Sequence, residues 1–313
     1  MMRFAVFGVG GVGGYFGGRL AQAGEDVIFI ARGAHLRALQ TSGLKVESLD
    51  GDFQLQPVQA TDDPAGMGAV DVVILGVKAW QVPHAARALR PHIAPHTVVL
   101  PLQNGVDAPV QLAAELGAEH VLGGLCQIVS YVVAPGHIRH AGFAPAITFG
   151  ELDNRRSARV EEIYQAMLRA GVHTTISADI HAAMWLKFLF IASFSGVGAV
   201  ARAPAGVLRT LPETRALIRQ AMAEVYAVAR TRGINLSPDA VDKALAAVDS
   251  LPADATASMQ RDVAAGRPSE LEAQNGAVVR LGREAAVAVP THEFIYGVLR
   301  PLELKARGEL QFE

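Results

Sequence analysis

The chain has 313 residues, half of them hydrophobic (50%), and a formal net charge of −2 at pH 7. This length allows about two domains, and the hydrophobic content supports a large core rather than disorder. A nearly neutral chain lacks the concentrated basic surface of a nucleic-acid-binding protein, so we expect no nucleic-acid partner. Cys126 is the one cysteine and cannot form an internal disulfide, which suits a reducing cytoplasm.

The segment from Arg3 to Arg32 follows the pattern strand, turn, helix, strand. An apolar run, Phe4 to Phe7, leads into a G-x-G-x-x-G motif, and a second apolar run, Val27 to Ile30, follows a stretch of helical length. The first glycine allows a tight turn, the second lets the backbone approach a pyrophosphate, and the third lets the helix pack against the strand. The alternative is a flexible glycine-rich loop. The predicted dinucleotide-binding residues are Gly8, Val9, Gly10, Gly11, Val12 and Gly13.

The end of the second strand indicates which dinucleotide binds. NAD enzymes usually carry Asp or Glu there to hold the ribose 2′-hydroxyl. This chain has Arg32 instead, and no acid between Asp26 and Glu47. A guanidinium can bind a 2′-phosphate through two hydrogen bonds. We therefore expect NADP(H), the alternative being that Arg32 is an ordinary surface residue.

Two further apolar runs, Val70 to Val77 and Thr97 to Leu102, are typical of parallel strands buried on both faces. Lys78 and Asn104 follow their carboxyl ends, where ligands bind in open α/β sheets. Lys78 is either a ligand of the cofactor or a solvated loop lysine. Asn104 is either a site residue or the N-cap of a helix predicted over Val106 to Leu116.

The pattern changes to long helical segments from Ala178 onward. We predict an α/β fold with a Rossmann-type NADP-binding domain at residues 1–177 and an all-α domain at residues 178–313, with the cleft between them as the expected site. Besides those above, the first domain should contain a helix at His35–Thr41, a hairpin within Leu44–Val58, a helix to Arg90, strands at Val121–Val133 and His137–Gly150, a helix at Arg155–Ala170 and a strand at Val172–Ser177. The expected helices of the second domain are Asp179–Ala201, Glu213–Arg232, Pro238–Asp249, Ala255–Ala265, Glu270–Ala286 and Thr291–Leu304.

The longest apolar stretch, Ala182 to Val200, is close to membrane-spanning length but contains Lys187. A charge at that depth in lipid costs at least ~2.5 kcal/mol. We therefore predict a buried helix of a soluble protein and no membrane association.

Lys187 is flanked by bulky apolar residues, and desolvation lowers the pKa of a lysine toward the range useful for proton transfer. A lysine that extends its ammonium to solvent is the alternative. Glu270 follows Ser269 at a predicted helix start, where it is either a site residue or part of the cap. The ten histidines show no metal-ligand spacing, so we expect no metal. These residues suggest proton transfer coupled to hydride transfer.

Taken together, the motifs resemble the ketopantoate reductase (2-dehydropantoate 2-reductase) family over nearly the whole chain. The resemblance implies NADPH-dependent reduction of ketopantoate to pantoate, in cytoplasmic pantothenate and coenzyme A biosynthesis, with Arg32 and Lys78 on the phosphates of NADPH. The matching residues are Gly8 to Gly13, Arg32, Val77 to Val82, Gln103 to Gly105, Trp185 to Lys187, Ser258 to Asp262, Glu270, Asn275 and Gly276.

The resemblance also implies roles around the substrate. Lys187 would be the general acid that protonates the ketone oxygen, and Glu270 would hydrogen-bond the substrate and help to position that lysine. Ser258 would contact the substrate, while Asn104 would lie between nicotinamide and substrate. We expect the assembly to be a homodimer.

Two positions depart from the family pattern. The best-known members carry asparagines four and eight residues after the catalytic lysine, where they contact the substrate, and this chain has Ile191 and Ser195. We expect Ile191 and Ser195 to be substrate-binding residues at these positions. The alternatives are therefore a reductase of another 2-keto acid or ketone, and an idle NADP-binding sensor. Retention of Lys187 and Glu270 disfavours the sensor.

Overall fold

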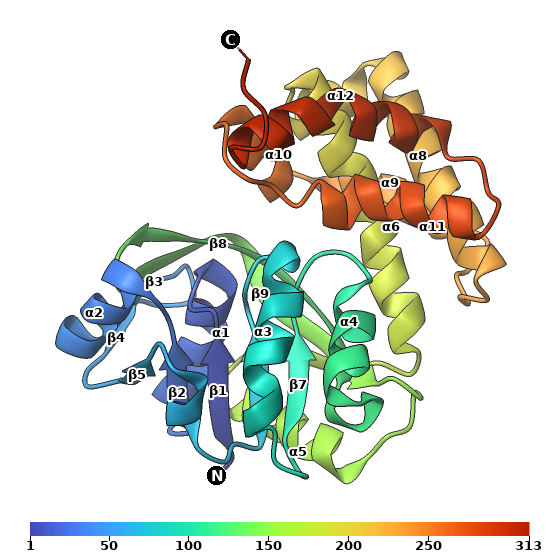
Figure 1. Cartoon of the computed structure of the whole chain (residues 1–313). Coiled ribbons are helices and arrows are strands. Elements are labelled where there is room, and N and C mark those ends of the chain that lie inside the picture. The colour runs from blue at the N-terminus through green and yellow to red at the C-terminus, as the bar shows by residue number, and fades with distance from the viewer. Residues whose placement is uncertain (313) are drawn as a thin grey trace. The chain divides into compact units, whose positions relative to one another are not determined.

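The computed structural model describes residues 1–312, which form two compact units (Figure 1). The first unit comprises Met1–Gln103 and Ala108–Ile180, and the second comprises Asn104–Asp107 and the chain from His181 onward. The first is α/β and the second is helical, so the predicted fold class is confirmed. The segment Asn104–Asp107 groups with the helical unit although it follows a strand of the first.

A five-stranded parallel sheet forms the centre of the first unit, in the order β5-β2-β1-β6-β7. From β1 the chain adds strands first on one side (β2, β5) and then on the other (β6, β7). The loops that follow β1, β2 and β6 therefore lie at the carboxyl ends of neighbouring strands, where dinucleotides bind in this class of fold. The strands are β1 (Arg3–Phe7), β2 (Asp26–Ile30), β5 (Gln59–Thr61), β6 (Val72–Leu75) and β7 (Val98–Pro101).

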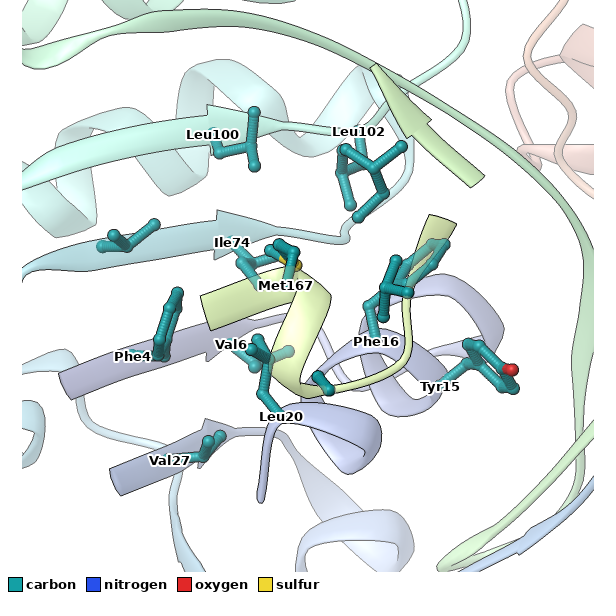
Figure 2. Close-up of a cluster of buried hydrophobic side chains, with 14 of the residues drawn as sticks. Phe4, Val6, Tyr15, Phe16, Leu20, Val27, Ile74, Leu100, Leu102 and Met167 are labelled. Carbon is teal, nitrogen blue, oxygen red and sulfur yellow. The ribbon is translucent and has the colours of Figure 1, made fainter. Parts of the chain in front are cut away.

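Successive side chains of each strand point to opposite faces of the parallel sheet. Since nearly all of them are buried in β1, β6 and β7, both faces of the sheet are covered. Phe4 and Val6 of β1 lie in one hydrophobic cluster, with Ile74 of β6 (Figure 2). Ala5 and Phe7 of β1 lie in the other cluster. Helices α1 (Gly11–Gln22) and α5 (Ala158–Arg169) pack in the first cluster, and α3 (Val82–Leu89) and α4 (Ala108–Leu116) pack in the second.

A second sheet completes this unit, in the order β10-β9-β3-β4 with β8 paired to β9. The hairpin predicted within Leu44–Val58 is confirmed, since β3 and β4 pair in antiparallel fashion. Helix α2 (Gly33–Ser42) connects β2 of the parallel sheet to β3 of the second sheet. The strands are β3 (Leu44–Glu47), β4 (Phe53–Leu55), β8 (Leu122–Ala134), β9 (His137–Glu151) and β10 (His173–Ile176).

The second unit is built from helices, one of which was not predicted: α7 (Ala205–Thr210). The prediction of one continuous helix over Glu270–Ala286 is wrong. That segment contains a π-helical turn (Glu272–Gly276) followed by α11 (Ala277–Glu284). The other helices are α6 (Ile180–Ala201), α8 (Pro212–Thr231), α9 (Ala240–Ser250), α10 (Ser258–Ala264) and α12 (Pro290–Ala306).

Within residues 1–312, α6 is the one helix long and apolar enough to cross a membrane. Of its most apolar 18-residue window, 67% is buried within the structure. Gly196 and Gly198 allow this close packing, since a Cβ atom at either would lie 2.5 Å from Asn275 Nδ2 or 2.7 Å from Gln260 Oε1. Helix α6 is therefore packed as a core helix.

Candidate active site

The three motif glycines have three different surroundings. Gly8 has φ +96°, a conformation that L side chains rarely adopt, and it makes the turn out of β1. A Cβ atom at Gly13 would lie 2.1 Å from the carbonyl oxygen of Gly8, so only glycine lets α1 approach the turn this closely. At Gly10 a Cβ atom would meet no protein atom within 4 Å. The open position is the one that the motif assigns to a pyrophosphate, and the residues fit that group.

Helix α1 begins at this turn with its first amide groups directed toward the loop. Gly10 is its N-cap and provides no side-chain hydrogen bond, and the first turn carries no acidic residue. The first intrahelical bond runs from Gly14 N to Gly10 O at 2.8 Å. The preceding amide groups have no partner within the helix, which is the arrangement that binds phosphate at helix N-termini.

Two residues outside the glycine motif, Gly76 and Ser130, pack against the loop. A Cβ atom at Gly76 would lie 2.7 Å from Gly8 O, so the end of β6 packs directly on the turn. A Cβ atom at Gly11 would lie 2.3 Å from Ser130 O, which places the β8–β9 hairpin against the start of α1. Gly76 carries a local signal, a glycine at a strand end, whereas nothing near Ser130 in the sequence indicates this contact.

Arg32 and Lys78 follow β2 and β6, the strands on either side of β1. Arg32 is exposed at the N-cap of α2, and its Nη2 lies 3.3 Å from Nε2 of His84. Lys78 is exposed, its backbone N–H donates to Oε1 of Gln81 at 3.1 Å, and its Nζ lies 5.8 Å from the ring centroid of Trp80. Both cations thus belong to the edge that carries the glycine loop.

Asn104 and Glu270 are brought together in the helical unit, although they are 166 residues apart in sequence. Asn104 Nδ2 donates to Glu270 Oε2 at 3.2 Å, and Glu270 is only 6% exposed. Because α4 begins at Ala108, the alternative that Asn104 is its N-cap is wrong. The amide of Asn104 thus orients the side chain of Glu270, which is largely shielded from solvent.

Two further contacts fix the segment that carries Asn104. Gly105 has φ +100°, and a Cβ atom there would lie 2.7 Å from the carbonyl oxygen of Ala273. Arg280 of α11 donates to both carboxylate oxygens of Asp107 at 2.7 and 2.8 Å. Asn104 therefore belongs to a segment held at both its middle and its end.

The π-helical turn after Glu270 is bonded to α6 by side chains. Asn275 Nδ2 donates to Ala192 O at 3.1 Å and lies 3.0 Å from Nδ1 of His292. Ser195 is fully buried, and its Oγ lies 2.5 Å from Gln274 Oε1 and 2.6 Å from Ile191 O. Such π turns occur frequently at functional sites. The hydroxyl of Ser195 can donate its proton to only one of these two oxygens at a time, and its predicted contact with the substrate stays a prediction.

Lys187 and Ser258 also lie in the helical unit. Lys187 is partly buried on α6, and Ile191, likewise partly buried, follows one turn later. Ser258 is the first residue of α10, and the Sδ atom of the adjacent Met259 lies 4.0 Å from Ser195 Oγ. The start of α10 and the second half of α6 are therefore neighbours.

Among residues 1–312, no group of three or more His, Cys, Asp or Glu side chains is arranged to hold a metal ion. Cys126 is buried, with Sγ 3.5 Å from Leu102 O. Any chemistry at the glycine loop or in the helical unit therefore depends on the polar side chains and backbone amides described above.

Comparison with known proteins adds to this geometry. Residues 4–154 match the family "Ketopantoate reductase PanE/ApbA", and residues 179–303 match "Ketopantoate reductase PanE/ApbA C terminal". The chain belongs to the ketopantoate reductase family. The family is one of reductases that act on small keto acids.

Relatives resemble this ketopantoate reductase family member along its whole length. A 2-dehydropantoate 2-reductase of Nostoc sp. is 32% identical over 314 residues, which cover 98% of each chain. The uncharacterized oxidoreductase YkpB of Bacillus subtilis is 30% identical over 302 residues, covering 96% of this chain and 99% of that protein. The crystal structure of a PanE/ApbA family ketopantoate reductase from Ralstonia eutropha JMP134 has a TM-score of 0.90 at 30% identity, covering 98% of this chain and 100% of that one.

Proposed function

We propose that the protein uses NADPH to reduce a 2-keto acid to the 2-hydroxy acid, and that the keto acid is ketopantoate, with pantoate as product. The observation that carries this proposal is the hydrogen bond from Asn104 to the buried carboxylate of Glu270. It pairs an amide donor with a buried acid inside the helical unit, and these are the two residues to which the family resemblance gives roles beside the substrate.

NADP(H) is the proposed cofactor because of the residues at the carboxyl edge of the parallel sheet. The open position over Gly10 and the amide groups at the start of α1 suit the pyrophosphate. Arg32 replaces the acid that would bind a ribose diol and repel a 2′-phosphate. Lys78 supplies a second cation at the same edge for the cofactor phosphates.

NADPH, when bound by the residues named above, would supply the hydride that reduces the keto carbon. Lys187 donates a proton from Nζ to the carbonyl oxygen, which yields the hydroxyl group, and then regains a proton from water. Glu270 hydrogen-bonds the substrate and helps to position the lysine, Asn104 orients the carboxylate of Glu270, and Ser258 contacts the substrate.

A second candidate is reduction of another, more apolar 2-keto acid by the same residues. The observation that favours it is Ile191, which has no group to pair with a substrate hydroxyl. An unpaired buried hydroxyl costs roughly 1–3 kcal/mol, so ketopantoate would bind with a raised KM. Cytoplasmic location, a place in pantothenate biosynthesis and homodimeric assembly stay predictions of the resemblance.

The experiment is to follow NADPH oxidation by the purified protein with a panel of 2-keto acids that includes ketopantoate, and to identify the product by chromatography. Pantoate formation at a saturable rate supports the proposal. Turnover of a more apolar keto acid with ketopantoate inert would establish the second candidate. No oxidation with any member of the panel, together with tight NADPH binding, would establish an NADP-binding protein without this activity.

A further inference from the structure

Arg32 and His84 form a contact at the dinucleotide edge that none of the sequence motifs includes. Arg32 Nη2 lies 3.3 Å from His84 Nε2. Arg32 precedes α2, which follows β2, and His84 is the third residue of α3, which follows β6. The contact therefore joins the two elements that follow the strands on either side of β1.

Hydrogen-bond chemistry determines the state of this pair. A guanidinium has donors and no acceptor, so Arg32 donates and Nε2 of His84 accepts. An imidazole that accepts at Nε2 carries its proton on Nδ1 and is neutral. The two side chains are both exposed, so a ligand in solution can reach them.

Among the described residues, no acid neutralises the charge of Arg32. Within residues 1–312, His84 is its hydrogen-bonding partner and no carboxylate forms an ion pair with it. Arg3, at the opposite end of the same sheet, lies 3.3 Å from the carboxylate of Asp26. Arg32 is thus a full positive charge oriented by a neutral ring, an arrangement suited to an incoming anion.

We infer that His84 is a second ligand of the cofactor 2′-phosphate, acting together with Arg32; this inference rests on the NADP(H) preference proposed above. When the phosphate binds, the guanidinium of Arg32 donates to its oxygens instead of to His84. The imidazole no longer accepts that bond and, in its other neutral tautomer, donates from Nε2 to a phosphate oxygen. Without a 2′-phosphate, as in NAD(H), the contact between Arg32 and His84 persists.

The test measures binding and needs no turnover. Adenosine 2′,5′-bisphosphate and adenosine 5′-monophosphate differ only in the 2′-phosphate, and each is titrated calorimetrically into the wild type, His84→Leu, Arg32→Ala and the double variant. His84→Leu should weaken bisphosphate binding by ~3- to 10-fold, the worth of one hydrogen bond, and leave monophosphate binding unchanged. His173→Leu, an exposed histidine of β10 in the same unit, is the matched control and should change neither.

The double variant shows whether both residues bind the same phosphate. In the Arg32→Ala background, His84→Leu should have an effect different from its effect in the wild type, because contacting residues couple. His84→Gln, which keeps an amide donor, should retain more affinity than His84→Leu and is the readout should the leucine variant unfold. Thermal unfolding of each variant checks that folding is unchanged.

The outcomes separate this inference from the proposed function. Equal binding of the two nucleotides by the wild type would contradict the proposed NADP(H) preference. Preferential binding of the bisphosphate that persists in both His84→Leu and His84→Gln would overturn the role of His84 and leave the preference to Arg32. Loss of affinity for both nucleotides alike would mean that His84 supports the fold of the edge and does not bind the 2′-phosphate.

Discussion

The two candidate regions differ in the sequence distance over which they are assembled. The glycine loop is made by neighbours, since Gly8, Gly10 and Gly13 lie within one turn and the start of one helix. The polar segment of the helical unit is made by distant residues: Asn104 and Glu270 are 166 positions apart. Backbone geometry therefore defines the first region and helix packing defines the second. Substitutions should accordingly affect cofactor binding and turnover separately.

The largest separation is expected for Lys187→Ala. Loss of a general acid should lower kcat by ~10²–10⁴-fold, while NADPH affinity, which we propose to reside in the first unit, should stay unchanged. Steady-state rates and a fluorescence titration with NADPH measure the two quantities. Lys243→Ala is the control, because Lys243 is an exposed lysine of the same unit that pairs with Asp239 at 3.0 Å. A kcat close to that of the wild type would make Lys187 a structural residue.

His292 tests how far the second region depends on buried long-range bonds. Burial lowers the pKa of its imidazole from 6.5 to about 4, and the ring is fully buried between Asn275 and the carbonyl oxygen of Ala221. Between those pH values the unfolded chain binds a proton that the folded chain does not. The stabilisation by neutral His292 is therefore complete above pH 6.5 and is lost as the pH falls toward 4, by on the order of 3 kcal/mol.

Urea unfolding at pH 7.5 and pH 5 measures this loss. His292→Gln keeps polar atoms without titrating, so its free energy of unfolding should fall less over the same interval than that of the wild type. An equal fall in both proteins would assign the acid sensitivity to other groups.

Gly13→Ala and Gly10→Ala should separate folding from cofactor binding within the loop. Alanine at Gly13 places its Cβ 2.1 Å from a backbone oxygen, which should lower the free energy of unfolding by ~1–3 kcal/mol. Alanine at Gly10 meets no protein atom within 4 Å, so stability should change by no more than ~0.5 kcal/mol while NADPH binding weakens. Unchanged NADPH binding by Gly10→Ala would show that the pyrophosphate does not approach this backbone.

The smallest effect is expected for Ile191→Asn. If position 191 faces the substrate, the amide should lower the KM for ketopantoate by ~2- to 10-fold through one hydrogen bond and leave the NADPH parameters unchanged. Ile191→Leu is the matched control, since leucine has nearly the shape of asparagine without the amide. An identical KM for both variants would remove position 191 from the substrate site.

The fold was largely predictable because its elements follow local rules. Strands buried on both faces appear as continuous apolar runs, and helix starts coincide with Pro212 and Pro290. The exceptions depend on tertiary structure. Helix α7 has only six residues (Ala205–Thr210), too few to establish a periodic pattern. The π turn at Glu272–Gly276 interrupts a good helical sequence, and Gln274 and Asn275 within it bond to α6.

The candidate site was predictable where one motif carries it. The glycine spacing and Arg32 are read from adjacent residues, and their surroundings follow from the strand, turn and helix that contain them. The contacts of Ser130, His84 and Gln274 depend on which elements become neighbours in space, and the sequence close to each gives no such signal. The catalytic roles of Lys187 and Glu270 were predicted from the family resemblance. Their positions in the sequence alone would favour a solvent-reaching lysine and a helix-capping glutamate.

We propose that this chain is a reductase that takes its hydride from NADPH, and the decisive quantity is the ratio of kcat/KM for NADPH to that for NADH. The ratio is measured with one saturating 2-keto acid for the wild type and for Arg32→Ala. We expect the wild type to prefer NADPH by more than tenfold, about 1.4 kcal/mol, and Arg32→Ala to lose most of this preference. Equal use of the two cofactors by the wild type would contradict it.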